Sequence, residues 1–118
     1  MKPEEFVQAL KVSCRDGAVR DCVEVFENPP GRRPDPELLR ISHWFRALSP
    51  TDRQFVEHAM REAADATLFG VLCTIDGVRF IEPQGEKSEF HLSAKREGVV
   101  SQISPNETFL HDLLRAEP

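Results

Sequence analysis

The sequence has no long apolar run and no excess of positive charge. Its most apolar stretch, residues 66–75, is about half as long as the ~20 residues that a membrane-spanning helix needs. Lysine and arginine total 15 against 20 aspartates and glutamates, and the net charge of −5 disfavours a nucleic-acid partner or an anionic membrane surface. The N-terminal residues lack the apolar segment of an export signal, so we expect a cytoplasmic protein that does not contact a membrane.

Cysteine is scarce, and its spacing fits neither a metal site nor a disulfide framework. Cys14, Cys22 and Cys73 form an odd count without a CxxC pair, which favours a reducing compartment. Each of the three falls on an apolar stripe of a predicted helix. We therefore predict buried, inert thiols and no cysteine nucleophile.

Glycine-rich loops are missing as well. The six glycines are scattered and fit neither GxGxxG nor GxxxxGK, the patterns whose backbone N–H groups hold phosphates. The serines lack the GxSxG context of a hydrolase nucleophile. We therefore expect no cofactor, no catalytic residues and no enzymatic activity.

What the sequence does contain is a strong signal for one long helix over residues 49–73. Ser49 is placed to cap this helix, a proline follows at the first helical position, and Asp52 completes a capping-box-like pattern. Apolar and small residues, beginning with Phe55, share one face, and charged residues share the other. The last turns lose the charged face, so we predict that other elements surround them. The small residues that would let another backbone approach closely are Ala59, Ala63, Ala66 and Gly70.

The end of this helix has a second interpretation. Residues 71–75 and 78–82 are β-prone and flank Asp76-Gly77, a dipeptide typical of a two-residue hairpin turn. A hairpin therefore competes with a helix that ends near Cys73 and uses Gly77 as a turn residue. We favour the helix.

The N-terminal part is also predicted to be helical. Residues 3–27 carry apolar side chains at a spacing of four, which is typical of an amphipathic helix. Gly17 weakens the middle of this helix, so it is either one helix or two with a break near Arg15. Residues 28–36 hold four of the nine prolines and predict an extended connector.

A second helix is expected after the proline-rich connector. Asp35 is placed to cap it, and an apolar spacing of three and four residues continues to Leu48. Trp44 and Phe45 fall on this apolar stripe, so both are predicted to pack in the core.

The C-terminal third predicts a small sheet and one more helix. Residues 78–82, 89–94 and 99–103 are short β-prone runs separated by turn residues, as in an antiparallel meander. Ser104 and the proline after it repeat the capping pattern, which predicts a last helix through Leu114. The predicted fold is a single α+β domain, with N-terminal helices and a central long helix packed with a three-stranded antiparallel sheet and a C-terminal helix.

Three residues on the polar face of the central helix have the spacing of metal ligands. His58, Glu62 and Asp65 follow at i, i+4 and i+7, so their side chains can point toward one ion. The chain has no HExxH motif and no obvious second ligand pair, and Arg61 is placed to pair with Asp65. A solvated charged face is therefore favoured, and we expect no metal.

Four other polar positions define an alternative function. Asp65, Asp76, Arg79 and His111 would line a polar pocket between the central helix and the sheet. In that alternative the protein is a small enzyme or a ligand-binding protein.

Four segments carry a resemblance to known sequences. They are LSPTDR at 48–53, ADATLFGVL at 64–72, IDGV at 75–78 and FLHDL at 109–113. With them the chain resembles a group of small, uncharacterised bacterial proteins over about its last 70 residues. The resemblance implies a stand-alone bacterial protein of unknown function, with an immunity- or antitoxin-like binding role as one option, and it transfers no catalytic residue.

A non-enzymatic protein-binding module is the leading hypothesis, because the chain is acidic and lacks a catalytic constellation. It requires a protein partner. A weak homodimer is also expected, since the apolar stripe from Phe6 to Phe26 is longer than a short three-stranded sheet can cover. The uncovered part is then available to a second copy or to a cognate protein.

Overall fold

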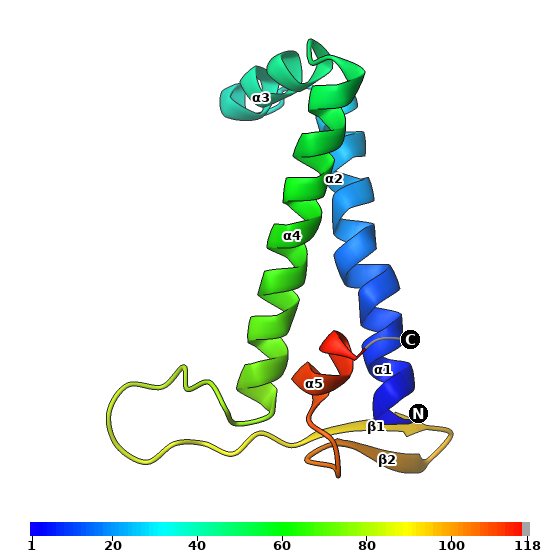
Figure 1. Ribbon diagram of the computed structural model, residues 1–118, viewed down its shortest axis with the longest axis vertical. Helices are drawn as coiled ribbons and strands as arrows, with labels where there is room; N and C mark the ends of the chain where they lie inside the picture. Colours follow the sequence, from blue (N-terminus) through cyan, green and yellow to red (C-terminus); the bar gives the residue numbers. More distant parts are fainter. Residues whose placement is uncertain (117–118) are drawn as a thin grey trace.

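The computed structural model describes residues 1–116 and consists of a long helical hairpin with a small sheet and a short helix at one end (Figure 1). The first arm starts at the N-terminus, and the second arm returns beside it in the opposite direction. In chain order the elements are α1 (Pro3–Leu10), η1 (Lys11–Asp16), α2 (Gly17–Glu27), α3 (Pro36–Arg46), α4 (Pro50–Ile75), β1 (Leu92–Arg96), β2 (Val99–Ser104) and α5 (Leu110–Arg115).

The first arm is one helical column whose middle, η1, is π-helical. The irregularity predicted near Arg15 therefore exists as a widening of the helix, and the chain does not break there. Gly17 is buried directly after η1, where a Cβ atom would lie 3.2 Å from Arg20 Nη2. A larger residue at this position would push the Arg20 side chain away.

The second arm, α4, confirms the predicted central helix. The Ser49 side chain caps it by accepting a hydrogen bond from the backbone N–H of Asp52 at 3.1 Å. At its other end Gly77 adopts a φ of 80°, and the Val78 N–H donates to the Cys73 carbonyl at 3.0 Å. Such a left-handed glycine is a common way for a helix to stop. The alternative hairpin across this glycine is therefore wrong.

The sheet has two antiparallel strands, so the prediction of three strands is wrong. The second and third predicted strands are present as β1 and β2, with β1 starting later, at Leu92. Residues 78–82 lie instead in the irregular connection between α4 and β1. There Glu82 accepts hydrogen bonds from the backbone N–H of Ser88 at 2.6 Å and from its hydroxyl at 2.8 Å, and these bonds lower the pKa of Glu82. This local loop competes with the ladder that a third strand would need.

The last helix was predicted to begin after Ser104, but it begins at Leu110. Ser104 is buried at the end of β2, where it pairs with Leu92. The helix cap comes from the end of α4, because the Asp76 carboxylate accepts from the backbone N–H groups of Leu110 at 3.0 Å and His111 at 2.9 Å. The Ser-Pro pattern predicted the wrong first residue for this helix, because the acceptor for its first backbone N–H groups is Asp76, which is distant in the sequence.

Burial is concentrated at the end of the hairpin that carries α5 and the sheet, which we call the closed end. Its buried core consists of Val7, Leu72, Ile103, Leu110 and Leu114. At the far end Phe45 is buried, as predicted, and its ring meets that of Phe26 edge-on at a centroid distance of 5.7 Å. The prediction that Trp44 also packs in the core is wrong, because it is 54% exposed while Phe45 and Ser42 occupy the face toward Phe26.

The protein is elongated. Its radius of gyration is 18.2 Å, whereas a compact domain of this length has a value of about 13.5 Å. Its accessible surface is 8774 Å², compared with about 6,500 Å² for a compact monomer of this mass. In residues 1–116, none of the helices combines the length and the apolar character needed to cross a membrane.

Candidate functional site

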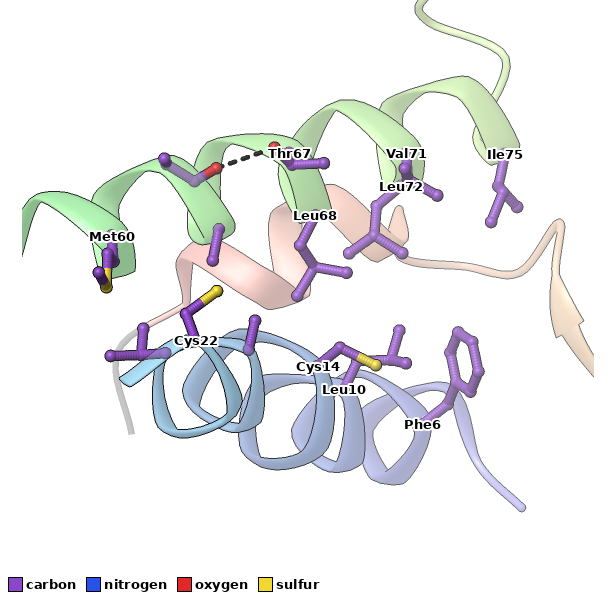
Figure 2. A pocket seen from close by; sticks show the side chains of 14 residues that line it. Phe6, Leu10, Cys14, Cys22, Met60, Thr67, Leu68, Val71, Leu72 and Ile75 are labelled. Atoms are coloured by element: carbon purple, nitrogen blue, oxygen red, sulfur yellow. Dashed lines mark hydrogen bonds between the residues drawn. The ribbon is translucent and has the colours of Figure 1, made fainter. Parts of the chain in front are cut away.

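An apolar groove runs between the two arms of the helical hairpin (Figure 2). Its volume is about 640 Å³, and α1, η1 and α2 form one wall while α4 forms the other. Leu68 and Leu72 of α4 point toward the first arm, from which Leu10 and Cys22 point back toward α4. The lining residues are Phe6, Leu10, Cys14, Ala18, Val19, Cys22, Met60, Ala63, Ala64, Thr67, Leu68, Val71, Leu72 and Ile75.

The chemistry of the groove is almost entirely apolar. None of its lining residues is charged, and the Thr67 hydroxyl donates a hydrogen bond to the Ala63 carbonyl at 2.9 Å. Because that hydroxyl already has a partner on its own helix, it has little need for one from a ligand. The groove can therefore gain free energy from an occupant mainly by burial of apolar surface.

The groove also corrects the prediction of three buried cysteines. Cys73 is buried, but Cys14 and Cys22 are exposed on the groove wall. The apolar stripe of the first arm was identified correctly, and its middle is left without a covering element. Burial of these two thiols therefore needs an occupant in the groove.

The face of α4 toward the groove is also less covered than predicted. In the last turns Leu72 and Cys73 are buried, but Val71 is 50% exposed, so these turns are not surrounded on all sides. Phe55, predicted on the buried face, is 69% exposed. Of the four small residues expected to let another backbone approach α4, three alanines are exposed, whereas the guanidinium of Arg79 lies over Gly70. The exposed alanines are Ala59, Ala63 and Ala66.

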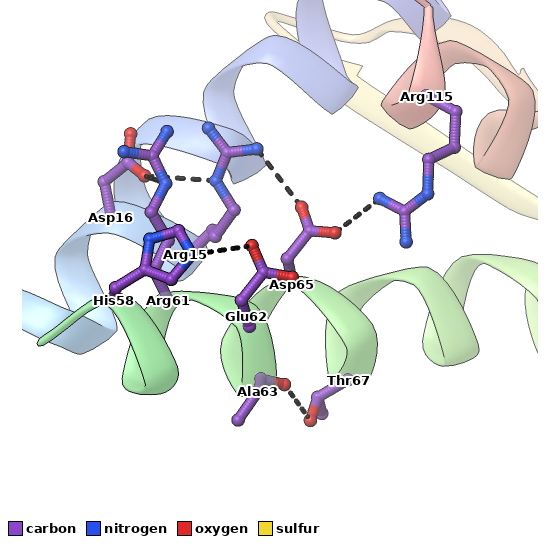
Figure 3. A network of polar contacts seen from close by, with 9 residues as sticks. All are labelled: Arg15, Asp16, His58, Arg61, Glu62, Ala63, Asp65, Thr67 and Arg115. Atoms are coloured by element: carbon purple, nitrogen blue, oxygen red, sulfur yellow. Dashed lines mark hydrogen bonds and ion pairs between the residues drawn. The ribbon is translucent and has the colours of Figure 1, made fainter. Parts of the chain in front are cut away.

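The charged residues of the two arms form a network on another side of α4 (Figure 3). Arg15 Nη1 donates to Asp65 Oδ1 at 3.2 Å, Arg15 Nε donates to Asp16 Oδ1 at 3.0 Å, and Arg115 of α5 also pairs with Asp65. Burial favours the neutral acid, but the hydrogen bonds from Arg15 and Arg115 outweigh it and lower the pKa of Asp65. The hydrogen bond to Asp16 raises the pKa of Arg15 against the effect of burial. Asp65 thus connects the first arm, α4 and α5.

The three residues with metal-ligand spacing do not meet at one point. His58 Nε2 lies 3.7 Å from Glu62 Oε1, while Asp65 points toward its two arginines (Figure 3). In residues 1–116, no group of three histidine, cysteine, aspartate or glutamate side chains is arranged to hold a metal ion.

Asp76 and His111 form the closest acid–imidazole pair of the closed end. The Asp76 side chain is 1% exposed, and its Oδ2 atom lies 2.6 Å from His111 Nδ1. The imidazole stacks on Phe109 with 5.3 Å between ring centroids and meets Phe69 edge-on at 5.7 Å. Together with the two backbone hydrogen bonds to α5, these contacts hold the last helix against the end of α4.

The four residues of the predicted polar pocket are therefore only partly brought together. Asp65, Asp76 and His111 lie along the contact between α4 and α5, because Arg115 pairs with Asp65 and stacks over Phe69, which meets His111. Arg79 lies over Gly70 instead. None of these four residues lines the groove. None of them lines a smaller hollow of about 330 Å³ either, which is surrounded by Asp16, Val19, Glu57, His58 and Arg61.

The groove itself was anticipated on one wall only. The long stripe of the first arm indicated apolar surface that the small sheet could not cover. On α4, however, Met60 and Val71 belong to an apolar face whose periodicity is the same whether its cover comes from the same chain or from another. The periodicity therefore identified the apolar face and did not show that part of it would stay uncovered.

Comparisons with known proteins give no identification. No protein-family model matches the chain, and no curated protein or solved structure is significantly similar to it. The groove and its surroundings are therefore the features of the molecule that bear on its function.

Proposed function

We propose that the chain is a non-enzymatic protein-binding module that receives an amphipathic helix in the groove between its two arms. One observation carries the proposal: the residues that line this hollow of about 640 Å³ come from both arms, and none of them is charged. A helix that repeats apolar residues at i, i+3, i+4 and i+7 presents a strip that matches such a surface.

The lining favours a helix over a small polar substrate. Sites for small substrates usually combine apolar walls with a few convergent polar groups that orient the ligand. Here the Thr67 hydroxyl is already bonded within its own helix. Asp76 and His111, which a catalytic alternative would use, are engaged in holding α5. The immunity- or antitoxin-like role implied by the resemblance is one instance of such a module.

The proposal can be tested by site-specific photo-cross-linking in the cells that produce the protein. A photoreactive phenylalanine analogue is placed at Val71, on the groove wall, and in a matched strain at Val99, which is 67% exposed on β2 and outside the groove. Adducts are separated by mass and identified by peptide sequencing.

We expect the Val71 position to give one dominant protein adduct that the Val99 position does not give. The adduct identifies the chain that occupies the groove, whether it is a different protein or this protein itself. Equal labelling from both positions, or no protein adduct from Val71, would contradict the proposed function.

A further inference from the structure

We infer that the occupant of the groove is the same face of a second copy of this chain, so that two helical hairpins form a four-helix bundle about a twofold axis. This inference rests on the proposed function, because it names the partner of the same groove. Helical hairpins with one apolar face are the halves from which antiparallel four-helix bundles are built.

The first argument is the amount of surface that one chain leaves exposed. Its 8774 Å² exceeds the value for a compact monomer of this mass by about 2,300 Å². A standard interface needs only about 800 Å² from each partner. The excess is larger than that share, and the groove and the long connection between α4 and β1 both contribute to it.

The second argument is the self-complementary chemistry of the groove. In a twofold interface the same patch meets itself, so every residue type must tolerate its own kind across the axis. A patch with charges of one sign would repel its copy, whereas the groove lining carries no charge at all. Its apolar residues match the same residues of a second copy without the need for a complementary charge pattern.

The third argument is the position of the charged network. Figure 3 shows that Ala63 and Thr67 of the groove project from the side of α4 opposite to His58, Glu62 and Asp65. A second copy seated on the groove would therefore leave these charged groups in water. The desolvation cost that burial of a charge imposes does not arise.

The fourth argument is the shape of α4. Its 26 residues correspond to a rod of about 39 Å, long enough for several layers of a bundle core. Ala63 is exposed on the groove wall, and the exposed Ala59 and Ala66 lie about one turn before and after it on α4. These three residues present little side-chain volume to an approaching helix.

The inference is tested by sedimentation velocity on the purified 118-residue chain, from about 1 to 300 µM, a range that brackets weak and moderate dimers. We expect a species of twice the 13.4 kDa chain mass to appear as the concentration rises. Val71→Glu should weaken the dimer by at least about 100-fold, because each dimer would bury the new charge twice. Val71 is half exposed in one chain, so its replacement is compatible with the folded monomer.

Phe55→Glu is the matched control, because Phe55 lies on the same helix, is 69% exposed and does not line the groove. It introduces the same charge and should leave the dimer intact. Thr67→Arg, at an exposed position of the groove wall, is a second variant that should also give monomers. Far-ultraviolet circular dichroism confirms that each variant keeps its helices.

A wild-type chain that stays monomeric over the whole range would overturn the inference. So would a dimer that Phe55→Glu dissociates and Val71→Glu leaves intact, since the contact would then lie outside the groove. In either case a cross-link from Val71 to a different protein would leave the proposed function standing. The failure of self-association is thus distinguishable from the failure of the protein-binding role.

Discussion

Val71 and Leu72 are neighbours on α4, yet Val71 is 50% exposed and Leu72 is fully buried. Both residues line the groove, but Leu72 also belongs to the buried core of the closed end, which α5 and β2 cover, whereas Val71 has no such layer over it. Both regions use aliphatic residues from the same helices. The difference shows that periodicity determines which face of a helix is apolar, and that the rest of the chain determines how much of this face is covered.

The two regions also differ in how polar contacts support them. At the closed end Asp76 is buried and joins α4 to α5 through three hydrogen bonds. Beside the groove the polar contacts lie on another side of α4, where Asp65 meets Arg15 and Arg115. Polar contacts therefore hold the closed end together, while the hydrogen bond on the groove wall, from Thr67 to Ala63, stays within α4 and joins no other element.

The largest contrast is expected between alanine substitutions at these two neighbouring positions. Leu72→Ala should lower the free energy of unfolding by about 3–5 kcal/mol, because it leaves a cavity in the buried core of the closed end. Val71→Ala should cost less than about 1 kcal/mol in the monomer, where the side chain already meets water. Urea denaturation at low protein concentration measures both. Similar losses for the two variants would contradict the division into a closed end and an open groove.

A smaller loss is expected when the contact between α4 and α5 is removed. Asp76→Ala leaves the backbone N–H groups of Leu110 and His111 without their acceptor, which should cost about 2–3 kcal/mol. Hydrogen exchange should show faster exchange of these two amides, while the amides in the middle of α4 change less. Asp112→Ala, at a side chain that is 61% exposed, is the control and should have little effect.

The sequence was sufficient to predict the elements whose signals are local. Ser49 identified the start of α4, Gly77 allowed its end, and Asp35 identified the start of α3. Each of these signals acts within a few residues, so it does not depend on the tertiary structure. The α+β class and the two strands that exist followed from the same kind of pattern.

The sequence was insufficient where distant residues decide the outcome. The cap of α5 comes from Asp76, which is 34 residues away from Leu110, and no local pattern records that contact. Within residues 1–116 the β-prone residues around Phe80 have no partner strand, because Glu82 and Ser88 close a local loop. The groove posed the same problem, since an apolar face is compatible with a cover from its own chain or from another.

The acid dependence of stability gives a third and smaller test. The pKa of Asp65 is below its ordinary value of 3.8, so the native state favours the ionised carboxylate and gains stability above that value. This contribution is lost as the pH falls through the lowered pKa of the folded state. Asp65→Asn should therefore cost about 1–2 kcal/mol at neutral pH and flatten the loss of stability below about pH 4.

Glu62→Gln is the matched control for this effect. Glu62 lies on the same helix, its side chain is 71% exposed, and its partner is the equally exposed His58. The control should keep the wild-type stability at neutral pH and the wild-type slope in acid. If both variants flatten the slope equally, the contact of Asp65 with the two arginines is not its source.

The last test measures how fast a reagent modifies the thiols of the groove and of the closed end, and it does not depend on the free energy of unfolding of a variant. In a dilute solution a thiol reagent should modify Cys14 and Cys22 rapidly, because both are exposed on the groove wall. Cys73 is 6% exposed, so the reagent can reach it only when the structure opens locally. It should react more than about 100-fold more slowly, a ratio that corresponds to an opening free energy of only ~2.7 kcal/mol.

As the protein concentration rises, a second copy on the groove should slow the reaction of Cys14 and Cys22 and leave the rate at Cys73 unchanged. In Val71→Glu the two groove thiols should stay reactive at all concentrations. Protection of Cys14 and Cys22 that persists in this variant would show that something other than a second copy covers the groove.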